Sequence, residues 1–264
     1  MTNIYRVRRL LQNGFNVSRC HHARILAYHS ISTVAADPWT VSPTQLDAQL
    51  KILHHGGFQV CSLDQLVERL QHNEDVSKLV CLTFDDAFVD FKEIALPILS
   101  AWDAHATLFV PVGKVGSASH WSQYAPMRPL MNWDELETVL QAGVTLGSHG
   151  LDHLRLPNVC SEVLQAEVEE SRDILRQRLG IEAQHFAYPY GASQQREQIA
   201  AQQAGYHSAV LFGGLWGNAP HTPRWALTRE PMMATQSEKE FLAILHGRRD
   251  WQALWHALRA QLSS

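Results

Sequence analysis

Two pairs of side chains that can bind a metal stand at the ends of apolar segments. Asp85 and Asp86 follow the apolar run LVCLTF at 79–84, and His149 and His153 are four residues apart in SHGLDH. Two imidazoles and one carboxylate form a ligand set typical of catalytic metal sites, with positions left open for water and substrate. Either aspartate could complete this set, and the other could serve as a general base beside the site.

Adjacent carboxylates can share one site only if the strand ends before them. Successive side chains of a strand point to opposite faces of the sheet, and burying unpaired carboxylates costs free energy. A strand that ends at Phe84 would let the backbone turn and direct both Asp85 and Asp86 into one site. A bound cation would offset their repulsion. The alternative is an acid pair that only caps the following helix.

The histidine spacing favours one shared face. If the turn after the preceding strand is helical, residues i and i+4 place both imidazoles on the same side. An HxxxH pair is a weak signal by itself. Its position at the end of one predicted strand, with the acid pair at the end of another, makes the prediction of a metal site much stronger.

Apolar runs typical of strands alternate with amphipathic helical segments along the chain. Ser42 with Gln45, Ser62 with Gln65, and Ser237 with Glu240 predict capping boxes at helix starts. The strands are predicted at 24–31, 58–62, 79–84, 106–112, 144–150, 185–191 and 207–214. The helices are predicted at 42–57, 62–72, 90–102, 132–143, 161–180 and 193–205, and from 237 onward.

This alternation predicts βαβ units and a parallel sheet. Seven or eight strands without a linker favour an α/β fold, a single distorted (β/α) barrel over residues 24–264 with a C-terminal helix, preceded by an N-terminal helical extension over 1–23. An open doubly wound sheet is the alternative, but no GxGxxG follows the first strand. In such a barrel the active residues lie at the carboxyl ends of strands, where Asp85, His149 and Tyr190 are expected.

Composition and charge exclude several classes of protein. The 264-residue chain has a formal net charge of -4 and a pI near 6.4, so it lacks the basic footprint of a nucleic-acid-binding protein. The four scattered cysteines contain no CxxC and predict free thiols. No apolar run is long enough for a transmembrane segment, and the first residues lack the apolar core of a signal peptide. We therefore expect a cytoplasmic protein.

Three segments, in this order, resemble the first three motifs of the polysaccharide deacetylases, the NodB homology domain or carbohydrate esterase family 4. LTFDDAF, SHGLDH and FAYPYG are similar to the signatures TFDDG, H-[ST]-x-x-H-P and R-x-P-[YF]-G, and the resemblance covers roughly residues 24–235. AYHSI near the start also resembles the branch with a FAYPYG third motif. The resemblance implies a barrel of about seven parallel strands and a metal-dependent hydrolase that removes N-acetyl, or O-acetyl, groups from sugars.

The resemblance also implies roles for the acids and histidines. Asp85 would be the general base, and Asp86, His149 and His153 would hold one divalent metal, most commonly zinc, with cobalt, nickel or iron as alternatives. The substrate would be an acetylated sugar, glycan or glycolipid.

Further residues are expected around the cleft. The third motif implies that Tyr188 and Pro189 bind substrate and that the backbone N–H of Tyr190 helps to hold the oxyanion. Trp121 could provide a face on which a sugar ring stacks.

Four positions depart from the family pattern. Ala87, Gly150, Leu154 and Ala187 stand where the signatures have glycine, serine or threonine, proline and arginine. The arginine usually orients the base, and Arg229 in ALTRE is the first candidate to replace it, with Arg224 second.

The general acid has two candidates. His29 follows the first predicted strand, and His246 in ILHGRRD faintly resembles a late family motif. Two other functions are weighed against deacetylation: a catalytically silent carbohydrate-binding protein on the same fold, and a metal-dependent amidase that acts on a non-sugar C–N bond.

Overall fold

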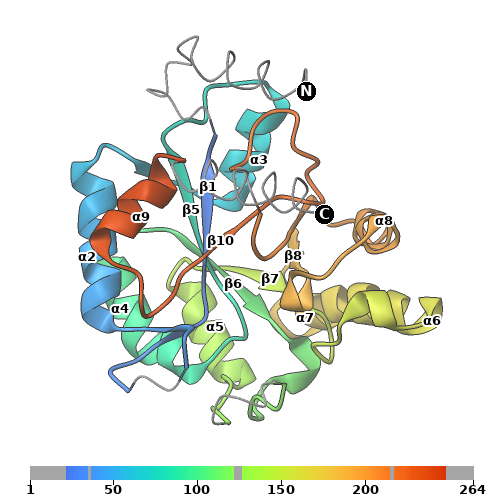
Figure 1. Ribbon diagram of the computed structural model, residues 1–264. Helices are drawn as coiled ribbons and strands as arrows, with labels where there is room; N and C mark the ends of the chain where they lie inside the picture. Colours follow the sequence, from blue (N-terminus) through green and yellow to red (C-terminus); the bar gives the residue numbers. More distant parts are fainter. Residues whose placement is uncertain (1–21, 35–36, 122–126, 215–216, 248–264) are drawn as a thin grey trace, which may run out of the picture.

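The computed structural model describes residues 22–34, 37–121, 127–214 and 217–247 (Figure 1). The N-terminal helical extension predicted over 1–23 lies outside the described residues except for its last two. Residues after 247 also lie outside them, and the predicted C-terminal helix is present as α9 over Glu238–Leu245, with its C-cap at His246.

The centre of the molecule is one curled sheet in which all paired strands are parallel, with the order β10-β1-β5-β6-β7-β8-β9 and β4 beside β5. This confirms the predicted distorted (β/α) barrel. The strands are β1 Arg24–Tyr28, β4 Gln59–Val60, β5 Leu79–Phe84, β6 Ala106–Val110, β7 Thr145–Ser148, β8 His185–Ala187, β9 Ser208–Val210 and β10 Glu230–Pro231, and a separate pair is formed by β2 Ser30–Ile31 and β3 Thr40–Val41.

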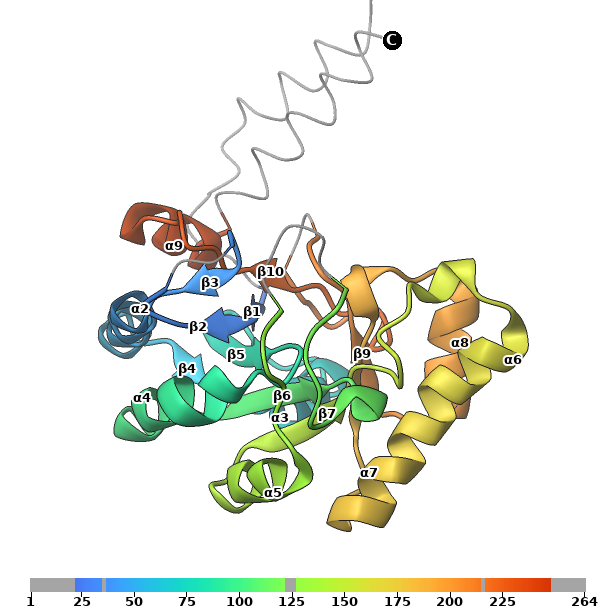
Figure 2. The same ribbon diagram turned by 90° about the horizontal axis from the view of Figure 1, so that it is seen from below.

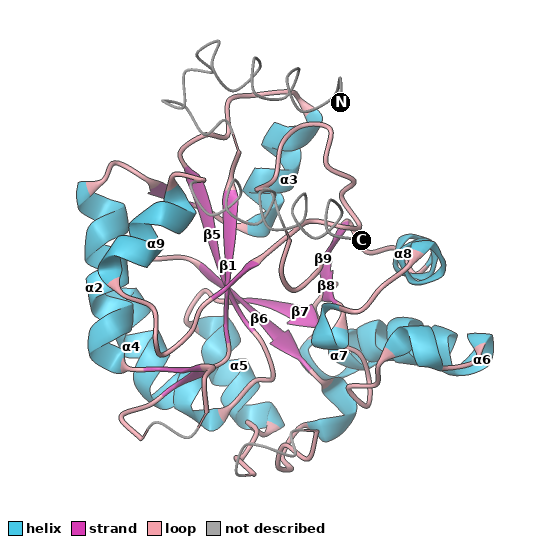
Figure 3. Ribbon diagram, in the orientation of Figure 1, coloured by secondary structure: helices cyan, strands magenta, loops and turns pink. Residues whose placement is uncertain are grey.

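Helices lie around the outside of the strands (Figures 2 and 3). The α-helices are α2 Pro43–His55, α3 Leu63–Gln71, α4 Leu96–Ala101, α5 Trp133–Gln141, α6 Ser161–Gln165, α7 Ser171–Leu179, α8 Gln195–Gln203 and α9 Glu238–Leu245. Two π-helical segments, η1 Phe91–Ala95 and η4 Ala166–Glu170, precede α4 and α7, and short 3-10 turns are η2 Val112–Lys114, η3 Leu156–Asn158 and η5 Pro189–Gly191.

The helix-capping predictions are confirmed at two of three sites. Ser62 and Ser237 both form full capping boxes. Ser42 accepts a hydrogen bond from the backbone N–H of Gln45, but the Ser42 backbone N–H does not donate back to the Gln45 side chain. The Gln45 amide instead donates to the carbonyl oxygens of Met233 and Gln236, at 3.0 and 3.1 Å, which ties α2 to the segment before α9.

The single helix predicted over 161–180 is wrong in its middle. The segment runs as α6, then the π-helical η4, then α7. Its predicted end is confirmed, because Gly180 adopts a left-handed conformation with φ 67°, which glycine tolerates without steric cost.

An extended segment over 227–231 joins the two edges of the curled sheet. At one edge the Leu227 N–H donates to Ala209 at 3.0 Å, and the Leu211 N–H donates back to Leu227 at 2.8 Å. At the other edge β10 pairs with β1, with Glu230 opposite Leu26. The segment therefore crosses the carboxyl ends of the strands and carries Arg229 with it.

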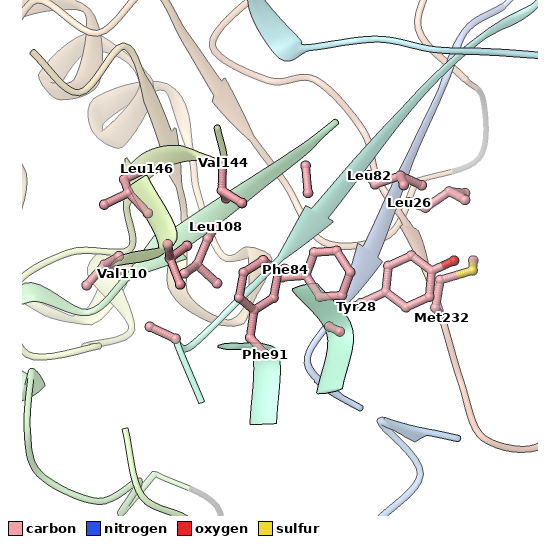
Figure 4. Close-up of a cluster of buried hydrophobic side chains, with 14 of the residues drawn as sticks. Leu26, Tyr28, Leu82, Phe84, Phe91, Leu108, Val110, Val144, Leu146 and Met232 are labelled. Atoms are coloured by element: carbon pink, nitrogen blue, oxygen red, sulfur yellow. The ribbon is translucent and has the colours of Figure 1, made fainter. Parts of the chain in front are cut away.

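The hydrophobic core fixes the end of β5, where the acid pair begins. The Phe84 ring stacks on Tyr28 with centroids 5.0 Å apart and meets the edge of Phe91 at 4.9 Å (Figure 4). All three rings are fully or almost fully buried. Burial of aromatic side chains of this size dominates core energetics, so the backbone that leads into Asp85 is firmly held.

None of the described helices is long and apolar enough to cross a membrane.

Candidate active site

The two aspartates reach the same site because the chain turns sharply after β5. The strand ends at Phe84, as predicted, and the next two residues after Asp85 adopt left-handed backbone conformations, with φ 74° at Asp86 and 56° at Ala87. A side chain at position 87 must be small, since Ala87 is 1% exposed. Alanine thus fulfils a role for which the family pattern has glycine.

Asp86, His149 and His153 form a group whose ligand atoms lie within 4.8 Å of one another. The Asp86 Oδ1 atom is 3.3 Å from His153 Nε2 and 3.7 Å from His149 Nε2. All three side chains are buried, and Asp86 Oδ1 has no hydrogen-bond partner among the described residues. Buried polar atoms are normally satisfied, so this unsatisfied oxygen between two imidazoles fits a divalent cation, as the sequence predicts.

The loop that carries the histidines is not helical, so the reasoning from helical spacing was wrong. Residues 149–153 form an irregular turn in which Gly150 has φ 78° and His153 has φ 58°. The imidazole rings nevertheless converge, with centroids 4.8 Å apart. Two left-handed residues, rather than one helical turn, place both rings on the same side.

His149 is held in the form that a metal ligand requires. Its Nδ1 atom is 2.7 Å from the carbonyl oxygen of Ala187, which can only accept, so Nδ1 carries the proton and Nε2 faces Asp86. Burial lowers the pKa of His149 to about 4, despite the opposing effect of the nearby Asp85 carboxylate. The ring is therefore neutral near pH 7, with a free lone pair on Nε2.

Asp85 is paired with Arg229, the first candidate of the two arginines. The guanidinium donates from Nη1 to Asp85 Oδ1 at 2.6 Å and from Nη2 to Oδ2 at 2.8 Å. Its other donors reach the Leu211 carbonyl at 2.8 Å and the Thr83 hydroxyl at 3.1 Å. Arg224 lies elsewhere, stacked on the Trp225 ring.

The charges around Asp85 decide its ionisation. Burial raises the pKa of this carboxyl, but the Arg229 cation, together with His149, outweighs burial and holds the pKa well below its ordinary value. Asp85 Oδ2 is also 3.9 Å from His149 Nε2. An ionised carboxylate therefore stands beside the three candidate metal ligands without joining them.

His29 also lies beside Asp85. Its Nε2 atom is 4.0 Å from Asp85 Oδ2, and its side chain is 19% exposed. The imidazole packs against the rings of Trp39 and Phe212, with centroid distances of 5.7 and 5.4 Å, and these two rings contact each other at 5.2 Å. His246 does not reach the site: its ring contacts Phe58, which precedes β4 at the amino-terminal end of the strands.

Two aromatic residues flank His153. The Trp121 ring stacks on this imidazole at 4.3 Å and 22°, and the Tyr190 ring meets it edge-on at 4.8 Å. Tyr190 is 43% exposed and adopts φ 60° within η5. Trp121 and Tyr190 thus both contact the ring of one candidate metal ligand, and a contact of either residue with substrate stays a prediction.

The predictions for Tyr188 and Pro189 need correction. The Tyr188 side chain is 0% exposed, and its hydroxyl donates to the Trp225 carbonyl at 3.0 Å. Pro189 is buried as well. In this structure both residues therefore support the turn that presents Tyr190 and do not themselves offer a surface to a substrate.

Trp39 and Phe212 were missed by the sequence reasoning. Phe212 lies two residues after β9, so reading every strand end could have found it. Trp39 precedes β3, a strand of two residues that gives no periodic signal.

The curled parallel sheet carries a buried Asp–His–His group that could hold a metal, and comparison with known proteins gives the family. A sequence model described as polysaccharide deacetylase matches residues 72–209, more than half of the chain. The chain belongs to the polysaccharide deacetylase family.

Individual proteins of known sequence or structure agree with this assignment. The chain is 27% identical over 187 residues to YxkH of Bacillus subtilis (strain 168), a protein assigned to the polysaccharide deacetylases, and the match covers 70% of this chain and 63% of YxkH. The chain thus spans less than two thirds of that relative's length.

Solved structures share the fold over most of the chain. The deacetylase PplD of Streptococcus pyogenes, solved in complex with acetate, is 25% identical with a TM-score of 0.72, and the match covers 84% of this chain and 96% of PplD. IcaB of Ammonifex degensii is 17% identical with a TM-score of 0.73, and the match covers 88% of this chain and 98% of IcaB. The second likeness concerns the fold alone.

Proposed function

We propose that this protein is a metal-dependent hydrolase that removes acetyl groups from an acetylated sugar, with N-acetyl groups as the main target. The observation that carries the proposal is the ionised Asp85 carboxylate, clamped by Arg229 and adjacent to Asp86, His149 and His153. Family membership and the acetate bound by the related PplD support acetyl transfer to water.

Asp86, His149 and His153 would hold one divalent cation. Their two nitrogen donors and one oxygen donor suit zinc, and also cobalt, nickel or iron. When bound, such a cation polarises the acetyl carbonyl and lowers the pKa of water toward about 7.

Asp85 would act as the general base that takes a proton from the attacking water. Its depressed pKa makes it a weak base but keeps it ionised throughout the physiological pH range. Arg229 fixes both carboxylate oxygens, so the base is held in one orientation and little reorganisation is needed when the proton moves.

His29 would supply the proton that the leaving amine needs. It is an imidazole beside Asp85 that is not one of the three candidate ligands, and its side chain is 19% exposed. The backbone N–H of Tyr190 would donate to the developing oxyanion, since donors aimed at this charge usually provide a large part of catalysis. Trp121 and Tyr190 would contact the sugar ring beside the scissile group.

Acetate release from a panel of substrates tests the proposal. The purified, zinc-loaded protein is incubated with N-acetylglucosamine oligosaccharides, a nucleotide-linked N-acetyl sugar, an O-acetylated sugar and a non-sugar acetamide. We expect acetate from at least one N-acetyl sugar, and none above background from Asp85→Asn. Asp134→Asn, which changes an exposed aspartate on α5, is the matched control. Release from the non-sugar acetamide alone would contradict the sugar assignment.

A further inference from the structure

The loop that carries the two histidines is held on its carbonyl side by η2, the 3-10 turn that follows β6. The N–H of Val112 donates to the carbonyl oxygen of Gly150 at 2.9 Å, and the N–H of Gly113 donates to that of Leu151 at 2.8 Å. A side chain at 113 would not fit, because its β-carbon would lie 2.8 Å from the Leu151 oxygen. This side of the loop is therefore held by two backbone hydrogen bonds and by an ion pair between Lys114 Nζ and Asp152 Oδ1 at 2.8 Å.

On the opposite side the loop donates to one carboxylate, that of Glu167. The Leu151 N–H lies 3.0 Å from Glu167 Oε2, and the Asp152 N–H lies 2.9 Å from Oε1 and 3.1 Å from Oε2. Glu167 belongs to the π-helical η4, between α6 and α7, and α7 contacts β7 (Figure 1). One side chain thus anchors the middle of the segment between His149 and His153.

Glu167 has no counter-charge to explain its burial. It is 2% exposed, and no lysine, arginine or histidine in the described part of the chain pairs with it. Burial raises the pKa of this carboxyl, whereas the backbone N–H groups of Asp152, Leu151 and Leu154 lower it. A buried carboxylate is tolerated only when its oxygens accept enough hydrogen bonds. Here the donors are backbone N–H groups of the segment that carries His149 and His153.

Gly150 makes room for this carboxylate. A β-carbon at position 150 would lie 2.7 Å from Glu167 Oε2, and Gly150 also has φ 78°, which disfavours other residues. The glycine that departs from the family signature and the buried glutamate therefore fit each other directly.

We propose that Glu167 is a positioning residue for the metal site, holding the 149–153 loop so that the His149 and His153 imidazoles keep their separation. This inference rests on the metal site of the proposed function. Without the carboxylate, the N–H groups of Leu151 and Asp152 lose their acceptor. The left-handed conformation of His153 is then no longer stabilised by contacts to Glu167. Groups that orient metal ligands typically change metal affinity by about 10–100-fold when removed.

Metal binding by the isolated protein tests the proposal without any substrate. Wild type, Glu167→Gln and Glu170→Gln are stripped with a chelator and titrated with Zn²⁺ by calorimetry, and the visible spectrum of each Co²⁺ complex is recorded. Glutamine keeps the shape of Glu167 but replaces one acceptor oxygen with an amide NH₂, which faces the loop N–H groups. Glu170, exposed in the same π-helical segment, is the matched control.

We expect Glu167→Gln to bind Zn²⁺ at least about tenfold more weakly and to show an altered Co²⁺ spectrum, while Glu170→Gln matches wild type. Equal affinity and an unchanged spectrum in Glu167→Gln would overturn the inference, even if its melting temperature fell. A Glu167→Gln protein that does not fold would also overturn it, because Glu167 would then serve the fold as a whole. If wild type bound no Zn²⁺, the proposed metal site itself would fail.

Discussion

Arg229 and Asp85, 144 residues apart in the sequence, meet through two parallel hydrogen bonds of 2.6 and 2.8 Å at the carboxyl ends of the strands. The arginine lies on the segment that joins the two edges of the sheet, so closure of the fold and orientation of the Asp85 carboxylate depend on the same few residues. The site can therefore be tested through stability as well as through activity.

Replacing Arg229 should lower both the stability and the activity of the protein. Arg229→Ala leaves Asp85 buried without its cation, and breaking a buried pair in this way typically costs about 3–5 kcal/mol of unfolding free energy. We expect the variant to lose at least about 100-fold in kcat/KM as well, the lower end of what a positioned base contributes. Urea unfolding and acetate release provide the two measurements. Arg224→Ala, which removes only a stack on Trp225, is the control and should change neither much.

The same pair predicts a pH dependence of stability. In wild type the pKa of Asp85 lies below its ordinary value of about 3.9, so its stabilising contribution is present above that pH and is lost as the pH falls through the lower folded-state pKa. In Arg229→Ala, burial of Asp85 is no longer offset by the cation and raises the pKa of its carboxyl. Protonation of Asp85 as the pH falls therefore removes the buried charge and increases the unfolding free energy of the variant. The difference in unfolding free energy between the two proteins should therefore be largest near neutral pH and should narrow on acidification. A difference that is constant from about pH 7 to 3 would contradict the assigned pairing.

His29 should affect turnover without affecting metal binding. We expect His29→Gln to lower kcat by about 100-fold or more, since it removes the proton donor for the amine, and to leave Zn²⁺ affinity within about threefold of wild type. Steady-state kinetics and calorimetry measure the two quantities. His246→Gln is the control, because that ring packs on Phe58 at the other end of the strands. Loss of activity in His246→Gln alone would reassign the acid.

Trp121 should act mainly on sugar binding. Stacking of an aromatic ring is worth about 0.5–1.5 kcal/mol, so Trp121→Ala should raise KM for an N-acetyl sugar by about 2–10-fold, with a smaller change in kcat. Because Trp121 also contacts His153, Zn²⁺ affinity of the variant is measured in parallel. A fall in kcat that follows metal loss, with KM unchanged, would show that the tryptophan supports the ligand and not the substrate.

The residues that do chemistry were easier to predict than the backbone that places them. Asp85, Asp86, His149 and His153 were found because they interrupt apolar strands at their ends, and Arg229 because the third motif lacked its own arginine. The left-handed turns at Asp86, Ala87 and His153 leave no such signal, since only glycine announces a positive φ reliably.

Short strands and hydrogen bonds between residues far apart in the chain also could not be predicted from the sequence. β10 has two residues and no alternation, yet it brings Arg229 across the mouth. Gln45 was expected to complete a capping box, but its side-chain amide instead donates to two carbonyl oxygens from residues 188 and 191 positions later. In the sequence Glu167 is one of many charged residues on a predicted helix, and only the tertiary fold reveals that it accepts hydrogen bonds from the 149–153 loop.

Metal stoichiometry shows whether Asp86, His149 and His153 form one metal site. Wild type, His149→Ala and the exposed control His55→Ala are loaded with Zn²⁺, desalted and subjected to elemental analysis. We expect one Zn²⁺ per chain in wild type and in His55→Ala, and almost none in His149→Ala. Wild type that retains no metal, or His149→Ala that retains as much as wild type, would contradict this assignment and would favour a carbohydrate-binding protein without catalysis.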